Sequence, residues 1–170
     1  MNNCSNTNNT KLNLKCKSRY LLLLMSLIII ILDQITKYIV RHNLHLYDQK
    51  KVFDFWNWTL AFNKGAAFSL FAEQGGWQRI FFGVLAVCVS VGLVYYILNK
   101  LYTFTVGIAV SFILGGALGN LVDRILFGQV TDFIDWHIKT HHWPAFNVAD
   151  AFITVGVALI LIEQVFFTKK

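Results

Sequence analysis

The fold is decided by residues 77–122, which read WQRIFFGVLAVCVSVGLVYYILNKLYTFTVGIAVSFILGGALGNLV. Between Arg79 and Asp123 this stretch carries a single charge, Lys100. Each half is about 20 apolar residues long, the length that a helix needs to cross the hydrocarbon core of a bilayer. Because only Asn99 and Lys100 separate the halves, they are predicted to form a tight antiparallel hairpin of two membrane helices.

Two further apolar runs flank this hairpin, at about 20–40 and 146–167. Of the 170 residues, 56% are hydrophobic and 14% are charged, whereas roughly 25% of the residues of soluble domains are charged. The sequence therefore predicts an all-α membrane protein with four transmembrane helices, over about 20–40, 77–98, 101–123 and 146–167. These helices form one domain of residues 20–170, behind an Asn-rich arm of residues 1–19 that is expected to be disordered.

The basic residues indicate how the helices are oriented. Four crossings place both termini on one side of the membrane. The terminal segments and the turn at Lys100 carry closely spaced lysines in short stretches, which the positive-inside rule weighs most. We therefore expect both termini to be cytoplasmic and residues 41–76 to lie outside. Since basic residues sit mostly at the ends of apolar runs, the net charge of +6 indicates contact with membrane lipid, not with nucleic acid.

Residues 41–76 form the largest predicted segment outside the bilayer. Within it, residues 52–62 read VFDFWNWTLAF, an aromatic and partly alternating pattern that predicts a strand or short hairpin. A small β-rich element is thus expected between the first two helices. Its aromatic side chains fit either an anchor in the membrane interface or a platform that handles an amphiphilic substrate, and the sequence favours neither.

Four carboxylates are predicted at membrane depth, where each costs roughly 2.5–3.5 kcal/mol at a helix centre on insertion scales. They are Asp33, Asp123, Asp132 and Asp150. Lys37 follows Asp33 by four residues, so the two can pair on one helical face. That pair is equally compatible with an anchor near the interface and with a functional site.

The third predicted helix brings small and polar residues together. Gly115 and Gly119 form a GxxxG pattern, which allows another helix backbone to approach closely. Gly116, Asn120 and Asp123 are spaced so that the amide and the carboxylate share one face. Arg124 is expected to neutralise part of the charge of Asp123.

The last two carboxylates lie on either side of the start of the fourth helix. Asp132, in the string Val130–Asp135, is followed by two apolar residues, so this segment is expected to re-enter or skim the membrane. Asn147 and Asp150 are three residues apart and lie on one face of the fourth helix. With this topology, all four membrane carboxylates converge at the outer end of the bundle.

Converging carboxylates suit several kinds of function. Two acids in a low-dielectric site cannot both ionise readily, so one keeps its proton and the pair can act as acid and base on a water molecule. This is the chemistry of an aspartic protease. Clustered carboxylates also bind metal ions and line proton or cation pathways in transporters, and a GxxxG helix alone could belong to a scaffold. The residues alone leave these classes open.

Five strings, in order along the chain, resemble the lipoprotein signal peptidases, or signal peptidase II. The strings are DQITK at 33–37, NKGAAFS at 63–69, GGALGNLVDR at 115–124, VTDFI at 130–134 and FNVAD at 146–150. This resemblance implies a bacterial inner-membrane aspartic endopeptidase with periplasmic residues 41–76 and an active site near that face. It implies cleavage of prolipoproteins before a diacylglyceryl-modified cysteine and inhibition by globomycin, with neither cofactor nor metal.

The resemblance also assigns roles to individual residues. The two catalytic aspartates of the family match Asp132 and Asp150, without indicating which is the base. Asp135 adds a nearby carboxylate that does not fill the motif position. Residues implied to bind substrate or support the dyad are Asp33, Lys37, Asn63, Gly65, Gly116, Asn120, Asp123, Arg124, Asn147 and Ala149.

Overall fold

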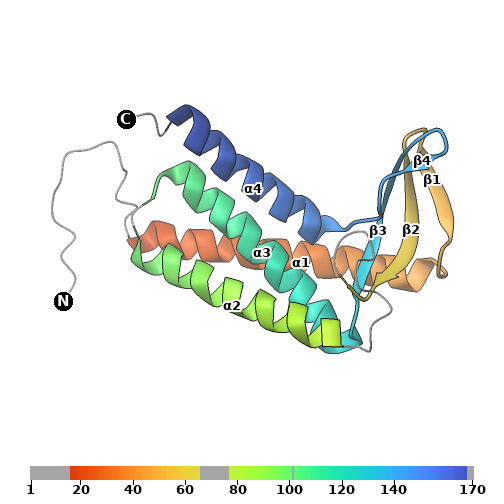
Figure 1. The fold of residues 1–170 in the computed structure, drawn as a ribbon, viewed down its shortest axis with the longest axis horizontal. Helices are drawn as coiled ribbons and strands as arrows, with labels where there is room; N and C mark the ends of the chain where they lie inside the picture. The colour runs from red at the N-terminus through yellow and green to blue at the C-terminus, as the bar shows by residue number, and fades with distance from the viewer. Residues whose placement is uncertain (1–15, 66–76, 101, 168–170) are drawn as a thin grey trace.

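The computed structural model describes residues 16–65, 77–100 and 102–167. The described helices are α1 (Cys16–Asn43), α2 (Trp77–Asn99), α3 (Phe104–Phe127) and α4 (Val148–Phe167). Each contains a stretch long and apolar enough to cross a membrane. α3 packs against the other three helices and forms the centre of the bundle (Figure 1). The prediction of four membrane-spanning helices is confirmed.

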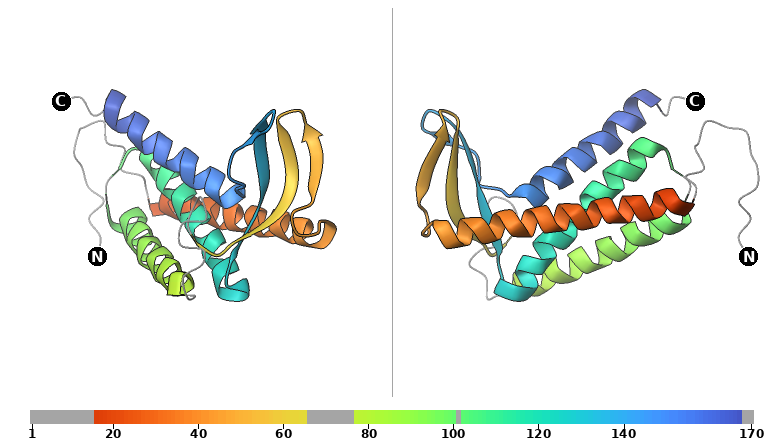
Figure 2. Two further views of the ribbon diagram at one scale, coloured as in Figure 1. Left: turned by 45° about the vertical axis from the view of Figure 1, so that its right-hand side comes forward. Right: turned by 180° about the vertical axis from the view of Figure 1, so that it is seen from behind.

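A four-stranded antiparallel sheet lies at one end of the bundle, with the order β1-β2-β3-β4. Its strands are β1 (Gln49–Phe53), β2 (Trp56–Asn63), β3 (Val130–Ile138) and β4 (His141–His142). The strands run crosswise to the helices (Figure 2), and the start of α1 and the end of α4 lie together at the opposite end (Figure 1). The sheet thus occupies the end at which the four carboxylates were expected to meet.

The sheet corrects one expectation. The β-rich element was placed between the first two helices, but half of its strands come from the connection between α3 and α4. The string from Val130 is strand β3, which pairs with β2 along most of its length; that it re-enters or skims the membrane stays a prediction. A strand forms there because β2 supplies a partner for its backbone hydrogen bonds, a long-range effect that local sequence does not contain.

Capping residues set the ends of α3. The side chain of Thr103 accepts a hydrogen bond from the amide of Val106, so the helix begins at Phe104, later than the predicted residue 101. At the other end Gly128 adopts a left-handed conformation with φ of 74°, which terminates the helix. Arg79 of α2 donates to the carbonyls of Arg124 and Ile125 at distances of 3.1 Å. These caps fix where α3 turns into β3.

Glycines let the helices approach closely. A Cβ on Gly115 would lie 2.8 Å from the Cβ of Ile29 in α1, so this glycine makes room for α1. A Cβ on Gly116 would lie 2.4 Å from the carbonyl oxygen of Ala149, so Gly116 makes room for α4. The predicted close approach of helix backbones at the GxxxG pattern is confirmed.

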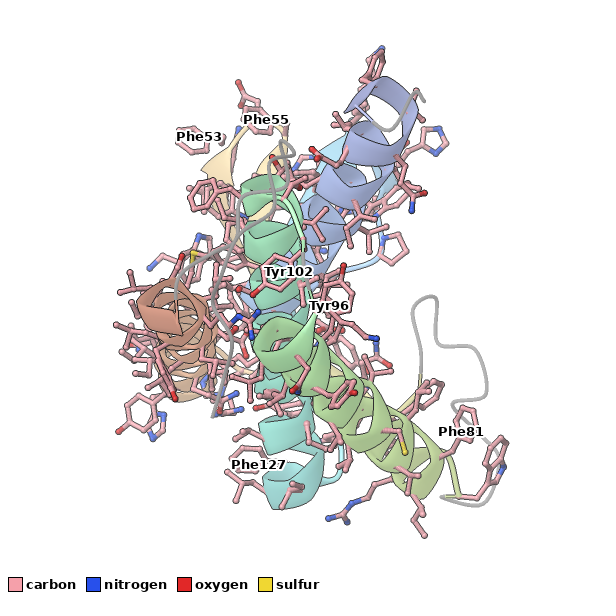
Figure 3. The ribbon with its side chains drawn as sticks, turned by 90° about the vertical axis from the view of Figure 1, so that its left-hand side faces the viewer. Phe53, Phe55, Phe81, Tyr96, Tyr102 and Phe127 are labelled. Atoms are coloured by element: carbon pink, nitrogen blue, oxygen red, sulfur yellow. The ribbon has the colours of Figure 1, made fainter. Side chains whose placement is uncertain are left out.

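Apolar side chains pack together at each end of the molecule. At the end away from the sheet, Tyr96 and Tyr102 stack with ring centroids 5.5 Å apart where α2 leads into α3 (Figure 3). At the sheet end, Val40 of α1 packs with Leu60 and Phe133 of the sheet. Large apolar side chains also cover the outer surface of α1 and α2; such exposure suits a helix in contact with lipid.

Candidate active site

Asp132 lies near the start of β3, with only 4% of its surface exposed. It stands opposite Ala61 of β2 in the sheet register, two residues before Asn63. The amide of Asn63 donates to Asp132 Oδ2 at 3.1 Å, and that of Asn147 donates to Asp132 Oδ1 at 2.7 Å. Two amide donors thus hold the carboxylate in one orientation.

Asp150 lies in the first turn of α4 and takes part in a reciprocal cap. The backbone amide of Asn147 donates to Asp150 Oδ2 at 3.2 Å, while the amide of Asp150 donates to Asn147 Oδ1 at 2.9 Å. This exchange satisfies free amides at the helix start in the manner of a capping box. The remaining oxygen, Oδ1, accepts from the amide of Asn120 at 2.8 Å. Asn147 therefore contacts both aspartates and brings β3 and α4 into one site.

The two asparagines have defined orientations. Asn120 Oδ1 accepts from Lys37 Nζ at 2.9 Å and from Asn147 Nδ2 at 3.2 Å, so its amide nitrogen faces Asp150. Asn147 Oδ1 accepts from the amide of Asp150, so its nitrogen faces Asp132. Each carboxylate therefore receives a side-chain amide donor whose direction is set by its other bonds.

A network of buried ions lies behind the asparagines. Lys37 Nζ is 2.8 Å from Asp33 Oδ2 and 3.5 Å from Asp123 Oδ2, and all three side chains have no exposed surface. Arg41 Nη1 is 3.4 Å from Asp123 Oδ1. With two acids and two bases the network is formally neutral, as buried charges require. The second oxygen of Asp33 accepts the backbone amide of Ala149 at 2.9 Å.

Three observations refine the predicted roles in this network. The expected pair of Asp33 and Lys37 is confirmed. Asp123 was expected to be neutralised by Arg124, but its ion pairs are with Lys37 and Arg41. The missing side chains of Gly116 and Gly119 leave room for α4 and for the carboxylate of Asp33, and the carbonyl of Gly119 accepts from Gln34 Nε2 at 3.0 Å.

Arg124 lies at the edge of the site. Its guanidinium is 3.4 Å from the carbonyl oxygens of Asn120 and Gly65, and it lies over the ring of Phe82 at 5.5 Å. The amide of Gly65 in turn donates to Asn63 Oδ1 at 3.0 Å, which directs the nitrogen of Asn63 toward Asp132. The rest of the predicted string at 63–69, from residue 66 on, lies outside the described residues.

Sequence reasoning missed Gln34, Arg41 and Thr131. Gln34 Nε2 donates to Asp33 Oδ2 and Asp123 Oδ1, both at 3.2 Å. Arg41 Nη1 donates to Thr131 Oγ1 at 2.8 Å, and the amide of Thr131 donates to Asp123 Oδ2 at 2.8 Å. These bonds anchor the residue that precedes Asp132. A signal for Arg41 was available, since it follows Lys37 by four residues and therefore shares a helical face with it.

Burial and charge set the protonation of the dyad. Burial, and secondarily the negative charge of Asp150, raises the pKa of Asp132 from its ordinary 3.8 to about 7. The hydrogen bonds from Asn63 and Asn147 oppose this rise. A carboxyl group with a raised pKa keeps its proton to higher pH, so Asp132 can serve as a proton donor near neutral pH.

Asp135 and the histidines form a separate cluster. Asp135 accepts from Asn57 Nδ2 at 3.0 Å and lies 2.8 Å from His142 Nδ1, without a hydrogen bond to either dyad aspartate.

Across residues 16–65, 77–100 and 102–167, no three His, Cys, Asp or Glu residues are placed to hold a metal ion. The chemistry that the dyad itself supports is acid–base catalysis on a polarised carbonyl.

Fold and site together define a multi-pass membrane protein with a carboxylate pair, one member buried and the other half-buried, where a small sheet meets the helix bundle. The family model for signal peptidase (SPase) II matches residues 25–166. The chain therefore belongs to the signal peptidase II family, as the five strings predicted.

Individual relatives support this assignment. A lipoprotein signal peptidase of Teredinibacter turnerae is 47% identical over 146 residues, covering 85% of this chain and 87% of the relative. One of Acinetobacter baumannii is 48% identical, covering 86% and 84%. A solved bacterial membrane enzyme, determined by the in meso method at 1.9 Å resolution, superposes with a TM-score of 0.78 at 34% identity, covering 88% of this chain and 95% of that one.

Proposed function

We propose that this protein is an aspartic endopeptidase that removes signal peptides from bacterial prolipoproteins, cleaving just before a diacylglyceryl-modified cysteine. The names of its relatives support the substrate class. The aspartic catalytic type rests on one observation: Asn147 donates hydrogen bonds to both Asp132 and Asp150. The carboxyl groups of these two residues differ in their environment.

The raised pKa of Asp132 supports the following division of roles. Asp150 acts as the general base: it removes a proton from a water molecule as the water oxygen attacks the scissile carbonyl carbon. Protonated Asp132 donates a hydrogen bond to the carbonyl oxygen and stabilises the charge that develops there. When the tetrahedral intermediate collapses, the C–N bond breaks and the proton taken up by Asp150 passes to the leaving amine. The dyad regains its starting protonation state on release of the products.

The buried network serves as support for this chemistry. Asn120 and Asn147 aim their amides at the carboxylates, and Lys37 holds Asn120 through its oxygen. We assign to Arg124 and Gly65, at the edge of the site, the binding of the substrate backbone. A site built on helix ends and strands in this way keeps its catalytic groups preorganised.

The proposed setting is the bacterial inner membrane. Both termini face the cytoplasm, and the sheet and dyad lie at the periplasmic face. Of the predicted arm of residues 1–19, the last four residues belong to α1 and the others lie outside the described residues. Membrane lipid surrounds the helices, and globomycin-type cyclic peptides inhibit the enzyme. The apolar outer faces of α1 and α2 support the lipid contact.

A cleavage assay in detergent tests the proposal. The substrate is a diacylglyceryl-modified prolipoprotein, and the wild type is compared with Asp132→Asn, Asp150→Asn and, as a matched control, Asp135→Asn. We expect the wild type and the control to cut before the modified cysteine, and each dyad variant to remain folded but inactive. Turnover by a dyad variant, or complete loss in the control, would show that the catalytic carboxylates are misassigned.

A further inference from the structure

A cavity lies under the sheet on the side of β1. It has a volume of about 580 Å³ and opens between the end of α1 and the β1–β2 hairpin. Its apolar lining consists of Ile39, Val40, Leu44, Val52 and Trp58. None of the residues that hydrogen-bond to the dyad lines this cavity, so it is a separate feature of the molecule.

The cavity opens at the boundary of the membrane. Ile39 and Val40 lie in the last turns of the membrane-spanning stretch that ends at Asn43. Ile39 is 45% exposed, and Ile35, one turn earlier on the same face, is 51% exposed. An apolar track therefore leads from the lipid-facing surface of α1 into the cavity, where an acyl chain can replace water that has few polar partners.

The rim of the cavity carries positive charge. Lys50 and Lys51 of β1 both line it. Lys51 Nζ is 2.6 Å from Asp54 Oδ1, so that pair is neutral. Within the described part of the chain Lys50 forms no ion pair, and the cavity therefore carries one net positive charge. Asn43 also lines the cavity, and its side-chain nitrogen donates one of its two hydrogens to the carbonyl of Ile39 at 2.7 Å.

We propose that this cavity binds one anionic phospholipid from the leaflet that adjoins the sheet. The phosphate faces Lys50, and an acyl chain follows Ile39 and Ile35 into the bilayer. The single net charge and the apolar floor match a headgroup of charge −1 on a long chain. The bound lipid braces β1, an edge strand whose residues are all exposed and whose described strand partner is β2.

Thermal unfolding of the purified full-length protein in detergent micelles tests this site. The probes are phosphatidylglycerol and, for comparison, zwitterionic phosphatidylcholine of the same chain length. The variants are Lys50→Gln and, as a matched loss of charge elsewhere on the sheet, Lys139→Gln. We expect phosphatidylglycerol to raise the unfolding temperature saturably in the wild type and in Lys139→Gln, and Lys50→Gln to need about fivefold more lipid for half of the effect.

A second variant covers the case in which Lys50→Gln does not fold. Val52→Trp places a ring in the cavity and is expected to abolish the saturable response while leaving the thermal stability without lipid intact. The proposal is overturned if both lysine variants respond equally, if phosphatidylcholine or short glycerol phosphate acts as well as phosphatidylglycerol, or if Lys50→Gln changes only the KM for the lipidated substrate. These outcomes concern lipid binding, so they are independent of the assignment of the dyad.

Discussion

Replacing Lys37 by methionine tests whether the buried ion network supports the dyad. Lys37 Nζ contacts Asp33 at 2.8 Å, Asn120 at 2.9 Å and Asp123 at 3.5 Å, and its side chain is fully buried. Methionine has a similar length but no charge, so Lys37→Met leaves two buried carboxylates with Arg41 as the only base of the network. Breaking a buried pair in this way costs about 3–5 kcal/mol.

The free energy of unfolding is measured by titration with a denaturing detergent in micelles of fixed composition. A double-mutant cycle with Asp33→Asn isolates the coupling, because the amide that replaces Asp33 still has an oxygen for the backbone amide of Ala149. We expect the double variant to lose less than the sum of the single losses, and exposed Lys139→Met to change stability by less than about 0.5 kcal/mol. A loss below about 1 kcal/mol in Lys37→Met, or strict additivity, would refute a stabilising network.

Two other predictions address packing and protonation. Gly116→Ala places a Cβ 2.4 Å from a backbone oxygen of α4 and should cost about 1–3 kcal/mol in the same unfolding titration; Gly92→Ala, with no atom within 4 Å of its Cβ, is the control and should not destabilise. The rate of cleavage should fall above about pH 7, because Asp132 then loses the proton that it donates to the carbonyl oxygen. Since the hydrogen bond from Asn63 lowers this pKa, Asn63→Ala should move the alkaline limb of the pH–rate profile to higher pH; a shift to lower pH would contradict the assignment.

The membrane helices could be predicted from the sequence because their determinant is local. Each apolar run spans roughly the thickness of a bilayer, and that length alone predicts a helix. The contacts within one helix were predictable for the same reason: Asp33 and Lys37 are one turn apart, as are Asn147 and Asp150. The roles of Asn120 and Asn147 in supporting the two aspartates were instead predicted from the resemblance to the signal peptidase II family.

Contacts between segments could not be obtained in this way. Whether Asp123 meets Arg124 or the bases of α1 depends on the rotation of α3 against α1, which the close approach at Gly115 sets. Likewise, strand β3 has a sequence in which apolar and polar residues alternate poorly, and it becomes a strand because β2 pairs with it. Both features depend on contacts between residues more than 60 positions apart.

The four carboxylates that converge at the sheet divide into two functional pairs. Asp33 and Asp123 neutralise Lys37, so the lysine can hold the oxygen of Asn120 without imposing a full positive charge on the dyad. An unneutralised lysine would favour the ionised form of Asp132, and the site would lack its proton at neutral pH. The buried ion pairs therefore orient the asparagine amides while their charges cancel, and Asp132 keeps the raised pKa that the proposed reaction requires.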